Sequence, residues 1–378
     1  MHRVQLHYTL SESRGEDLIR NPLLDLLHAV EDNGSISAAA RQLGFSYRHV
    51  WGELKRWEEE LGSPLIIWVK GQPARLTEFG TKLLWAERQA QARLQAQIES
   101  LRADLEHAFA AAFDDSTHVL SLYASHDEAL TLLRESAREQ NLHLDIRFSG
   151  SVDAIRALNE GRCMLAGFHT RLQPEPGSIS SRSYKPLLKP GQHKVIGFAR
   201  RSQGLIVAPG NPLRLRSLAD LVERQARFAN RALGTGTRVL LEELMAEQQI
   251  TSEQIRGFGT VEPSHTAVAL AVAAGQVDAG LGIEAAARAR GLDFVPLVEE
   301  QYLLACLKSA LEEPGIMALC SMLRTPEWRR QLAGLPGYQP ERCGEVLAMS
   351  QVLPWWRYRT KKRAPVSVPV LSSAVPPT

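Results

Sequence analysis

The chain has 378 residues, of which 44% are hydrophobic and 23% charged, and its formal net charge is +2. This length suits two or three domains, and the composition is globular and excludes wholesale disorder. The small net charge excludes a uniformly basic nucleic-acid binder, so any DNA contact must depend on locally placed charges. The cysteines lack the paired spacing of zinc or redox motifs, so we expect reduced thiols at Cys163, Cys306, Cys320 and Cys343.

The N-terminal residues predict a short strand from Val4 to Leu10 and then a helix that starts at Pro22 and ends at Asn33-Gly34. We find neither a charged-then-apolar leader nor an apolar run of about 18 to 20 residues. We therefore expect a cytoplasmic protein that does not contact membranes.

The stretch from Ser35 to Leu61, SISAAARQLGFSYRHVWGELKRWEEEL, predicts two short helices joined by a turn at Gly44. Ser46 would cap the second helix, and apolar residues recur along it at helical spacing. This arrangement is typical of a helix-turn-helix, although an ordinary helical hairpin remains the alternative. We predict DNA contacts by Ser35, Ser46, Tyr47, Arg48, His49, Lys55 and Arg56.

A strand, a turn and a second strand follow, from Leu65 to Val69, Gly71 to Ala74 and Arg75 to Thr77. A basic hairpin directly after a recognition helix is typical of a wing. It would place Lys70, Gln72 and Arg75 near the DNA backbone or the minor groove. The order of these signals favours DNA binding over the plain helical hairpin.

Several segments between Val4 and about Leu84 resemble the winged-helix domain of ModE-type molybdate regulators: VQLHYTL, NPLLDLLHAVEDNGSISAAARQLGFSYRHVW, EELG and RLTEFG. GSISAAARQLG and RLTEFG also resemble LysR-type regulators more distantly. The resemblance implies a transcriptional regulator.

A long helix is predicted from Thr77 to about Phe109, with an apolar stripe at steps of three and four residues: Leu83, Ala86, Ala90, Leu94, Ile98, Leu101, Leu105 and Ala108. The stripe could pack on its own chain or on a second copy. The LysR resemblance implies a dimer linker, and we expect a homodimer or homotetramer on a palindromic operator.

From His118 onward, strands alternate with helices, which predicts an α/β domain with mainly parallel sheets, divided into two lobes. The overall fold class is therefore α+β multidomain. We assign a winged helix to residues 1–80, a linker helix to 81–113, the two-lobed domain to 117–350 and a disordered basic tail to 354–378.

The segment FANRALGTGTRVLL, from Phe228 to Leu241, places backbone amides, hydroxyls and a helix N-terminus at one spot, which suits an anion. A simple capped glycine turn is the alternative, and the segment is neither a P-loop nor a dinucleotide turn. Other strand ends could face the same crevice. The predicted ligand-binding residues are Ser125, His126, Asp127, Ser151, Asn230, Arg231, Thr235, Gly236, Thr237, Arg238, His265 and Thr266.

Five segments between about Val119 and Leu311 resemble a periplasmic-binding-protein-like domain that occurs with helix-turn-helix domains and with molybdopterin biosynthesis proteins. They are GSVDAIRALNEGRCMLAGFHT, QGLIVAPGNP, NRALGTGTRVLLEEL, HTAVALAVAAGQVDAGLGIEAAARARGLDFVPL and EEQYLL. The resemblance implies a two-lobed clamshell that senses a small ligand in a molybdenum or tungsten context, with molybdate or tungstate as the first candidates. We expect neither a cofactor nor metal ligands. The paired small β-barrels of ModE are not visible here.

Motifs of hydrolases, metalloproteases and nucleotide-binding enzymes are missing from the sequence. Ser125, His126 and Asp127 are adjacent, so they cannot stack into a catalytic triad. We expect a DNA-binding transcriptional regulator that senses a small anion, and not an enzyme. A ligand-storage or delivery protein in molybdenum cofactor metabolism is the alternative, and an enzyme acting on an anionic pterin or nucleotide is a third hypothesis.

Overall fold

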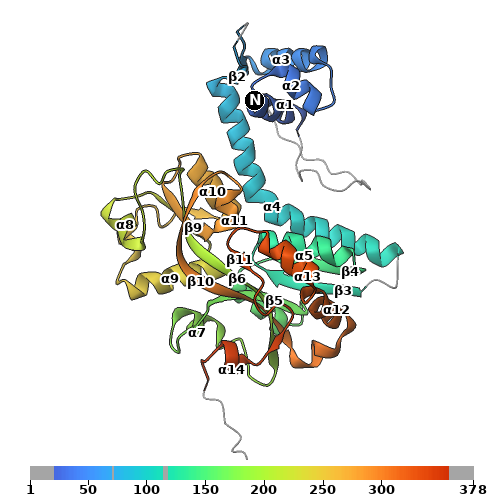
Figure 1. The fold of residues 1–378 in the computed structure, drawn as a ribbon, viewed down its shortest axis with the longest axis vertical. Helices are drawn as coiled ribbons and strands as arrows, with labels where there is room; N and C mark the ends of the chain where they lie inside the picture. The colour runs from blue at the N-terminus through green and yellow to red at the C-terminus, as the bar shows by residue number, and fades with distance from the viewer. Residues whose placement is uncertain (1–20, 70–71, 114–117, 357–378) are drawn as a thin grey trace, which may run out of the picture.

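The structure is a computed structural model that describes residues 21–69, 72–113 and 118–356 (Figure 1). A small helical domain sits at one end of a long helix, α4 (Glu78–Phe113), and a larger α/β domain packs against the other half of this helix. The predicted strand at Val4 to Leu10, the wing residue Lys70 and the basic tail beyond Trp356 lie outside the described residues. Within the described ranges, no helix is both long enough and apolar enough to span a membrane.

The N-terminal domain has the predicted order of helix, helix-turn-helix and wing. Asn21 caps the first helix by accepting from the amide of Leu23 at 3.0 Å, and Gly34 ends it with a φ of 58°. The core includes Leu27, Val30 and Leu54, which have no exposed surface. The elements are α1 (Pro22–Asn33), α2 (Ile36–Gln42), α3 (Tyr47–Leu61), β1 (Ile66–Ile67) and β2 (Arg75–Leu76).

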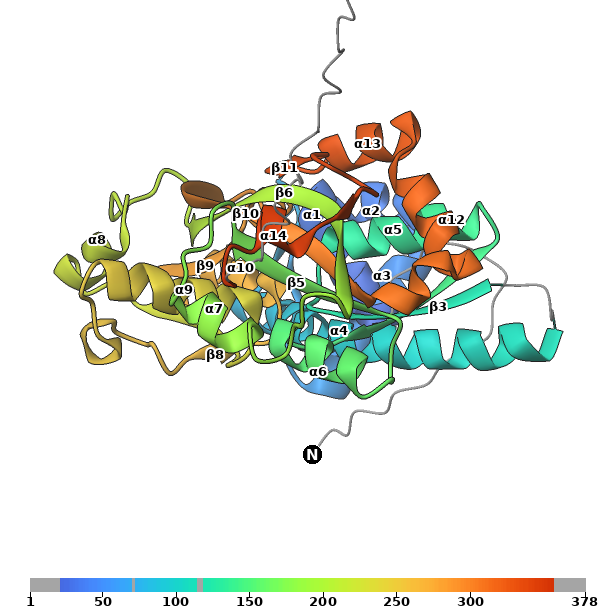
Figure 2. The same ribbon diagram turned by 90° about the horizontal axis from the view of Figure 1, so that it is seen from below.

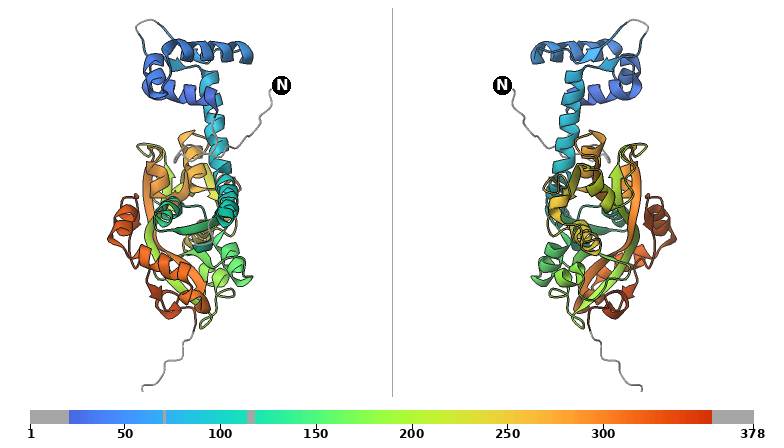
Figure 3. Two further views of the ribbon diagram at one scale, coloured as in Figure 1. Left: turned by 90° about the vertical axis from the view of Figure 1, so that its right-hand side faces the viewer. Right: turned by 90° about the vertical axis from the view of Figure 1, so that its left-hand side faces the viewer.

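Helix α4 belongs to both domains. Leu84 in its first turns is buried in the N-terminal core, and its later turns pack on β4 (Leu142–Phe148) and α10 (His265–Ala273) of the α/β domain. Figures 1 and 3 show the N-terminal domain held away from the α/β domain by this helix. Contacts within the chain therefore cover part of the predicted apolar stripe, while Ala86, Ala90 and Leu101 stay exposed. A dimer seam on this exposed face remains a prediction.

The α/β domain is built on one mixed sheet with the strand order β4-β3-β5-β10-β6-β9-β7-β8, and β11 and β12 pair with β6. The other strands are β3 (His118–Ala124), β5 (Leu165–Arg171), β6 (His193–Val207), β7 (Phe228–Arg231), β8 (Val261–Glu262), β9 (Ala279–Ile283), β10 (Asp293–Leu307), β11 (Tyr338–Gln339) and β12 (Val346–Leu347).

The prediction of mainly parallel sheets is wrong at the centre of the molecule. β6 and β10 are antiparallel strands of 15 residues each, and they run through both lobes. The polar run from Arg200 to Gln203 lies in the middle of β6. It stays in one strand because β10 places Glu300 opposite Arg201, so that opposite charges meet in the sheet.

Helices flank the two halves of this sheet, as Figure 2 shows. The first lobe carries α5 (Glu128–Arg138), α6 (Ser151–Asn159), α12 (Pro314–Leu323), α13 (Pro326–Ala333) and α14 (Met349–Val352). The second carries α8 (Leu218–Glu223), α9 (Gly236–Glu247), α10 and α11 (Glu284–Arg288), with a 3-10 turn at Ser252–Gln254. Helix α7 (Ile179–Tyr184) packs on α9 across the lobes, and a second 3-10 turn, Lys308–Glu312, follows β10.

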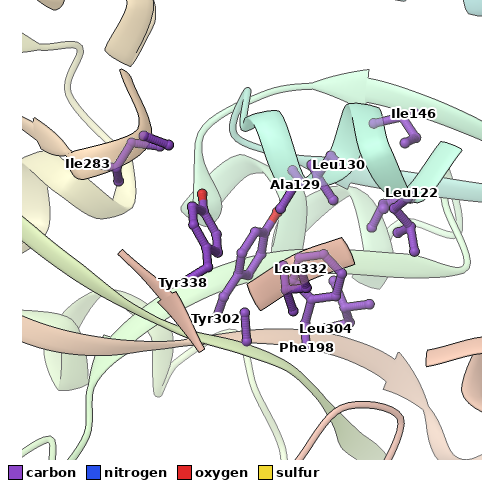
Figure 4. Close-up of a cluster of buried hydrophobic side chains, with 14 of the residues drawn as sticks. Leu122, Ala129, Leu130, Ile146, Phe198, Ile283, Tyr302, Leu304, Leu332 and Tyr338 are labelled. Atoms are coloured by element: carbon purple, nitrogen blue, oxygen red, sulfur yellow. The ribbon is translucent and has the colours of Figure 1, made fainter. Parts of the chain in front are cut away.

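A buried core beneath α5 holds the first lobe together and reaches the crevice between the lobes (Figure 4). Leu122, Leu130 and Leu304 lie in its apolar part and have no exposed surface. Tyr302 and Tyr338 lie at the edge of this cluster, and the hydroxyl of Tyr338 donates to Asp127 at the N-terminus of α5. The apolar core thus ends at a polar cluster between the lobes.

Candidate DNA-binding face and interlobe ligand site

The first turn of α3 presents a polar surface. Ser46 caps the helix by accepting from the amide of His49 at 3.2 Å, as predicted, after a turn in which Gly44 has a φ of 71°. Val50 and Leu54 are buried, so the predicted contact residues Tyr47, Arg48 and His49 lie on the exposed side. Ser35 caps α2 in the same way, accepting from the amide of Ala38 at 3.4 Å.

Two predicted DNA contacts are engaged in ion pairs along α3. Lys55 donates to Glu58 and Arg56 donates to Glu53, both at 2.6 Å. Burial alone would raise the pKa of Glu58, but hydrogen bonds from Lys55 and from the amides of Leu65 and Ile66 lower it. Such exposed pairs contribute about 0–1 kcal/mol each, so phosphates could compete for these cations. Among the described cations of α3, Arg48 alone forms no ion pair.

The wing is a short antiparallel pairing of Ile67 with Arg75, and the predicted contacts Gln72 and Arg75 are exposed. An aromatic strip runs beside it. Tyr47 stacks on Trp51 at 6.3 Å between ring centroids, and Trp51 meets Trp68 edge-on at 5.8 Å. The helical spacing of Tyr47 and Trp51 was visible in the sequence, but the approach of Trp68 depends on the fold.

The centre of the interlobe cluster is Arg201 on β6. Its Nε donates to Glu300 at 2.6 Å, and its Nη1 donates to Asp127, which also accepts from the hydroxyl of Tyr338 at 2.7 Å. Burial alone would lower the pKa of Arg201, but Glu300, Tyr338 and Asp127 raise it well above the usual value. Arg201 is thus a partnered cation that holds β6, β10 and α5 together.

Arg231, at the end of β7, is the opposite case. Its side chain is 2% exposed, and its Nε and Nη1 are closed off from solvent without a hydrogen-bond partner among the described groups. Burial, together with the charge of Arg201, lowers the pKa of Arg231 to about 10. A buried charge without a partner is unfavourable, so this guanidinium favours the binding of an anion.

Further unpartnered polar atoms lie in the same cluster. The hydroxyls of Ser125 and Ser151 and the Nδ1 atoms of His169 and His265 are sealed without a hydrogen bond among the described groups. Burial first, and then the charges of Arg201 and Arg231, hold the pKa of both histidines well below the usual value. Both rings are therefore neutral, and each can donate one hydrogen bond to an anion.

Two helix N-termini face each other across the lobes. The amide of Val152 in α6 donates to the carbonyl of Gly234 at 3.4 Å, and a Cβ on Gly150 would lie 2.8 Å from that carbonyl oxygen. A Cβ on Gly236 would lie 2.8 Å from His169. The glycine turn of the second lobe therefore sits directly against the first lobe, and the clamshell is closed. Helix N-termini attract negative charge.

Most of the predicted ligand-binding residues gather here, but some do not. Thr235 caps α9, Thr237 accepts from Gln203, and Thr266 donates to Glu128 at 3.3 Å. Asn230 bonds instead to backbone groups of Arg231 and Phe258. Arg238 points away from the cluster, since it pairs with Glu242 at 2.7 Å and lies over the Phe258 ring.

His126, another predicted ligand residue, faces the linker helix. Its Nε2 lies 3.6 Å from the buried carboxylate of Glu99 on α4, which also lies 3.6 Å from Arg134. Farther up α4, Arg93 forms two hydrogen bonds with Glu262, at 2.9 and 3.2 Å. Helix α4 therefore contacts the first lobe near α5 and the second lobe at β8.

Sequence reasoning missed several members of the cluster as ligand residues: Glu128, His169, Arg201 and Glu300. Arg201 and Glu300 lie in charged runs that are visible in the sequence, but their pairing depends on the register of β6 and β10. For His169 the sequence carries no such signal. Within the described ranges, no group of His, Cys, Asp and Glu side chains has an arrangement that could hold a metal ion.

Two open cavities lie elsewhere on the molecule. One of about 870 Å³ is lined by Lys189, His193 and Lys308 of the first lobe, and one of about 360 Å³ lies between α4 and the second lobe beside Arg93 and Arg256. Both cavities are open to solvent, whereas the polar atoms of the interlobe cluster are sealed, and this cluster is the candidate ligand site.

Residues 22–81 match the family of bacterial regulatory helix-turn-helix proteins of the lysR type, and residues 133–324 match the PBP superfamily domain. The chain is 30% identical over 201 residues to the uncharacterized protein YvgK of Bacillus subtilis (strain 168), a match that covers 53% of the chain and 64% of YvgK. It thus spans less than two thirds of that relative's length.

A second relative is an uncharacterized protein encoded in the 5′ region of the ferredoxin 2Fe-2S gene of Clostridium pasteurianum. It is 30% identical over 110 residues, which cover 29% of the chain and 97% of that protein. Among solved structures, full-length BenM is 17% identical, with 82% of this chain and 96% of BenM covered and a TM-score of 0.41. The LysR family regulator CbnR is 19% identical, with coverage of 78% and 95% and a TM-score of 0.36.

Proposed function

We propose that the chain, which carries a helix-turn-helix domain of the lysR type and belongs to the PBP superfamily through residues 133–324, is a transcriptional regulator whose two lobes sense a small anion. The observation that carries the ligand proposal is Arg231, a buried guanidinium with two unpartnered nitrogen atoms. Unpartnered serine and histidine groups and two facing helix N-termini complete a site rich in hydrogen-bond donors.

A small oxyanion suits this site better than a large ligand. The lobes touch at Gly150 and Gly234, and the polar atoms around Arg231 are closed off from solvent. Molybdate and tungstate are the first candidates because of the ModE-type resemblance in the sequence. A pterin-sized compound would require the lobes to open.

The linker helix offers a route from ligand to DNA. Glu99 contacts the first lobe next to His126, and Arg93 contacts Glu262 in the second lobe. A change in lobe closure would therefore change the position of α4 relative to the lobes. Because α4 also enters the core of the winged helix through Leu84, its movement would reposition α3. We expect a homodimer or homotetramer on a palindromic operator, acting in the cytoplasm where DNA is found.

The test is calorimetric titration with molybdate, tungstate, sulfate and phosphate, followed by gel shifts on the organism's own upstream DNA with and without the anion that binds. Arg231→Gln should lose binding by about 100-fold or more, since it removes a charged partner of a desolvated anion, while DNA binding without ligand persists. Arg238→Gln is the matched control, because Arg238 follows in the same segment but points away from the site.

Loss of DNA binding by folded Arg231→Gln protein would contradict the proposal that the lobes bind the ligand and the winged helix binds DNA. An oxyanion that binds tightly to a protein with no affinity for DNA would favour storage or delivery in molybdenum cofactor metabolism instead.

A further inference from the structure

The interlobe cluster contains an acceptor as well as donors. Glu128, the first residue of α5, accepts from Thr266 of the second lobe through Oε1 at 3.3 Å. Its Oε2 is closed off from solvent, and none of the described groups donates to it. A site that binds a fully ionised oxyanion through donors alone has no use for this second carboxylate oxygen.

The charges of the site also argue against an ionised Glu128 beside a bound oxyanion. Arg201 and Arg231 supply two positive charges, and Asp127 and Glu300 supply two negative charges when both are ionised. The site is then balanced before a ligand enters. An ionised Glu128 together with a divalent oxyanion would place three further negative charges in a sealed region, which is strongly unfavourable.

We propose that the interlobe site binds its oxyanion together with one proton, which Glu128 takes up from solvent and donates from Oε2 to a ligand oxygen. The inference rests on the proposed anion site at Arg231. The neutral carboxyl group would then act as a donor beside the guanidinium, and no bond other than that to the proton is made or broken.

The groups around Glu128 fit this role. Asp127 and His126 directly precede it at the N-terminus of α5, Thr266 donates to it from α10 beside His265, Arg231 lies on β7 and Tyr338 on β11. Burial, and then the charge of Asp127, already raise the pKa of Glu128, while His126 and Thr266 oppose this only in part. A bound anion would raise this pKa further, so that binding draws in a proton.

The role also predicts which oxyanions bind better at high pH. Molybdate, tungstate and sulfate carry no proton at neutral pH, so the proton must come from solvent and their affinity should fall as pH rises. Dihydrogenphosphate, which is present at neutral pH, can bring the proton itself, so phosphate binding should depend less on pH until this species loses its proton. In both cases the same oxygen-to-oxygen hydrogen bond forms at Glu128.

The experiment is calorimetric titration of the full chain with molybdate and tungstate at constant pH, in buffers of low and high ionisation enthalpy. Wild type should take up about one proton per anion, and the affinity should fall up to about tenfold per pH unit above the pKa of free Glu128. Glu128→Gln keeps the shape and supplies an amide donor, so it should bind within a few-fold of wild type with no proton uptake.

Two further variants keep the test decisive. Glu128→Ala should lose both the proton uptake and at least tenfold in affinity, because it removes the donor. Glu135→Gln removes an exposed carboxylate from the same helix and should behave as wild type. Wild-type binding without proton uptake, or unchanged uptake in Glu128→Gln, would overturn the inference and leave the anion site intact. If no oxyanion, phosphate included, binds to the wild type, both the inference and the proposed ligand class are overturned.

Discussion

The winged helix and the interlobe site differ in how their side chains are held. The candidate DNA contacts are exposed and come from one continuous stretch, α2 to β2. The candidate ligand contacts are buried and come from residues as far apart as Ser125 and Glu300. An exposed side chain can exchange one partner for water or phosphate, whereas a buried polar atom depends on the partner that the fold provides.

This difference sets the scale of the effects that substitutions should have. Ion pairs on α3 such as Lys55–Glu58 lie in solvent, where they contribute about 0–1 kcal/mol. Removing one partner from a buried pair costs about 3–5 kcal/mol because the other charge stays buried. The two regions can therefore be tested against each other by substituting the same kind of residue in each environment.

The largest expected effect is that of Arg201→Ala. It leaves the carboxylates of Asp127 and Glu300 without their cation, so the free energy of unfolding of the α/β domain should fall by about 3–5 kcal/mol. Urea denaturation followed by tryptophan fluorescence, to which the buried Trp328 of this domain contributes, would measure it.

The matched control for that substitution is Arg200→Ala. Arg200 is the neighbour of Arg201 on β6, but it is one-third exposed and pairs with Glu299 at 3.2 Å on the outer side. Its removal should cost about 0–1 kcal/mol. Equal losses in the two variants would contradict the contrast between buried and exposed pairs.

A smaller effect is expected from Gly150→Ala, which tests closure of the lobes. The added Cβ would lie 2.8 Å from the carbonyl oxygen of Gly234, so the closed state should lose about 1–3 kcal/mol relative to the open one. Anion affinity measured by calorimetry should fall accordingly, and DNA binding without ligand should be retained. Gly259→Ala is the control, because nothing lies within 4 Å of a Cβ at that position. A wild-type affinity in Gly150→Ala would mean that the ligand does not need the closed contact.

The next effect concerns the DNA face. Arg48→Ala removes the cation on α3 that has no acid to pair with in the helix, and DNA affinity should fall by about 1–3 kcal/mol. Anion binding should not change. Arg56→Ala should have a smaller effect, since Arg56 is paired with Glu53. Gel shifts at two salt concentrations would identify the kind of contact that is lost. Loss of a phosphate contact reduces the salt dependence of DNA binding, whereas loss of a base contact changes the sequence preference.

The same contrast explains what the sequence predicted. The caps Ser35 and Ser46 and the turn at Gly44 act on neighbouring residues, so their positions along the chain were sufficient to predict them. Arg231 was also found, because the glycine turn after it is local. Asn230 and Arg238 seemed equivalent to it in the sequence, but the side-chain direction of each depends on Phe258 and Glu242.

The pairing of Arg201 with Glu300 could not be predicted in this way. It depends on the register of two long antiparallel strands that are almost 100 residues apart. Charges in a central strand, such as those on β6, are unfavourable unless a partner faces them. Only the fold supplies that partner, and the same is true of the contact between Glu99 and His126.

The smallest effect is predicted for Ser46→Ala. This variant tests whether a residue that caps its own helix affects only the stability of its own domain. The hydroxyl of Ser46 satisfies the amide of His49, so its loss should reduce the stability of the winged helix by about 1 kcal/mol. Ser46→Gly should recover most of this, because glycine at an N-cap leaves the amide open to water at a cost of a few tenths of a kcal/mol. Thermal unfolding of the three proteins would measure the difference, with Ser37→Ala, an exposed position within α2, as the control. We expect a loss confined to the winged helix, with anion affinity unchanged, because the hydrogen bond of Ser46 is local to α3. An effect on anion binding would mean that the two regions are coupled more tightly than through α4 alone.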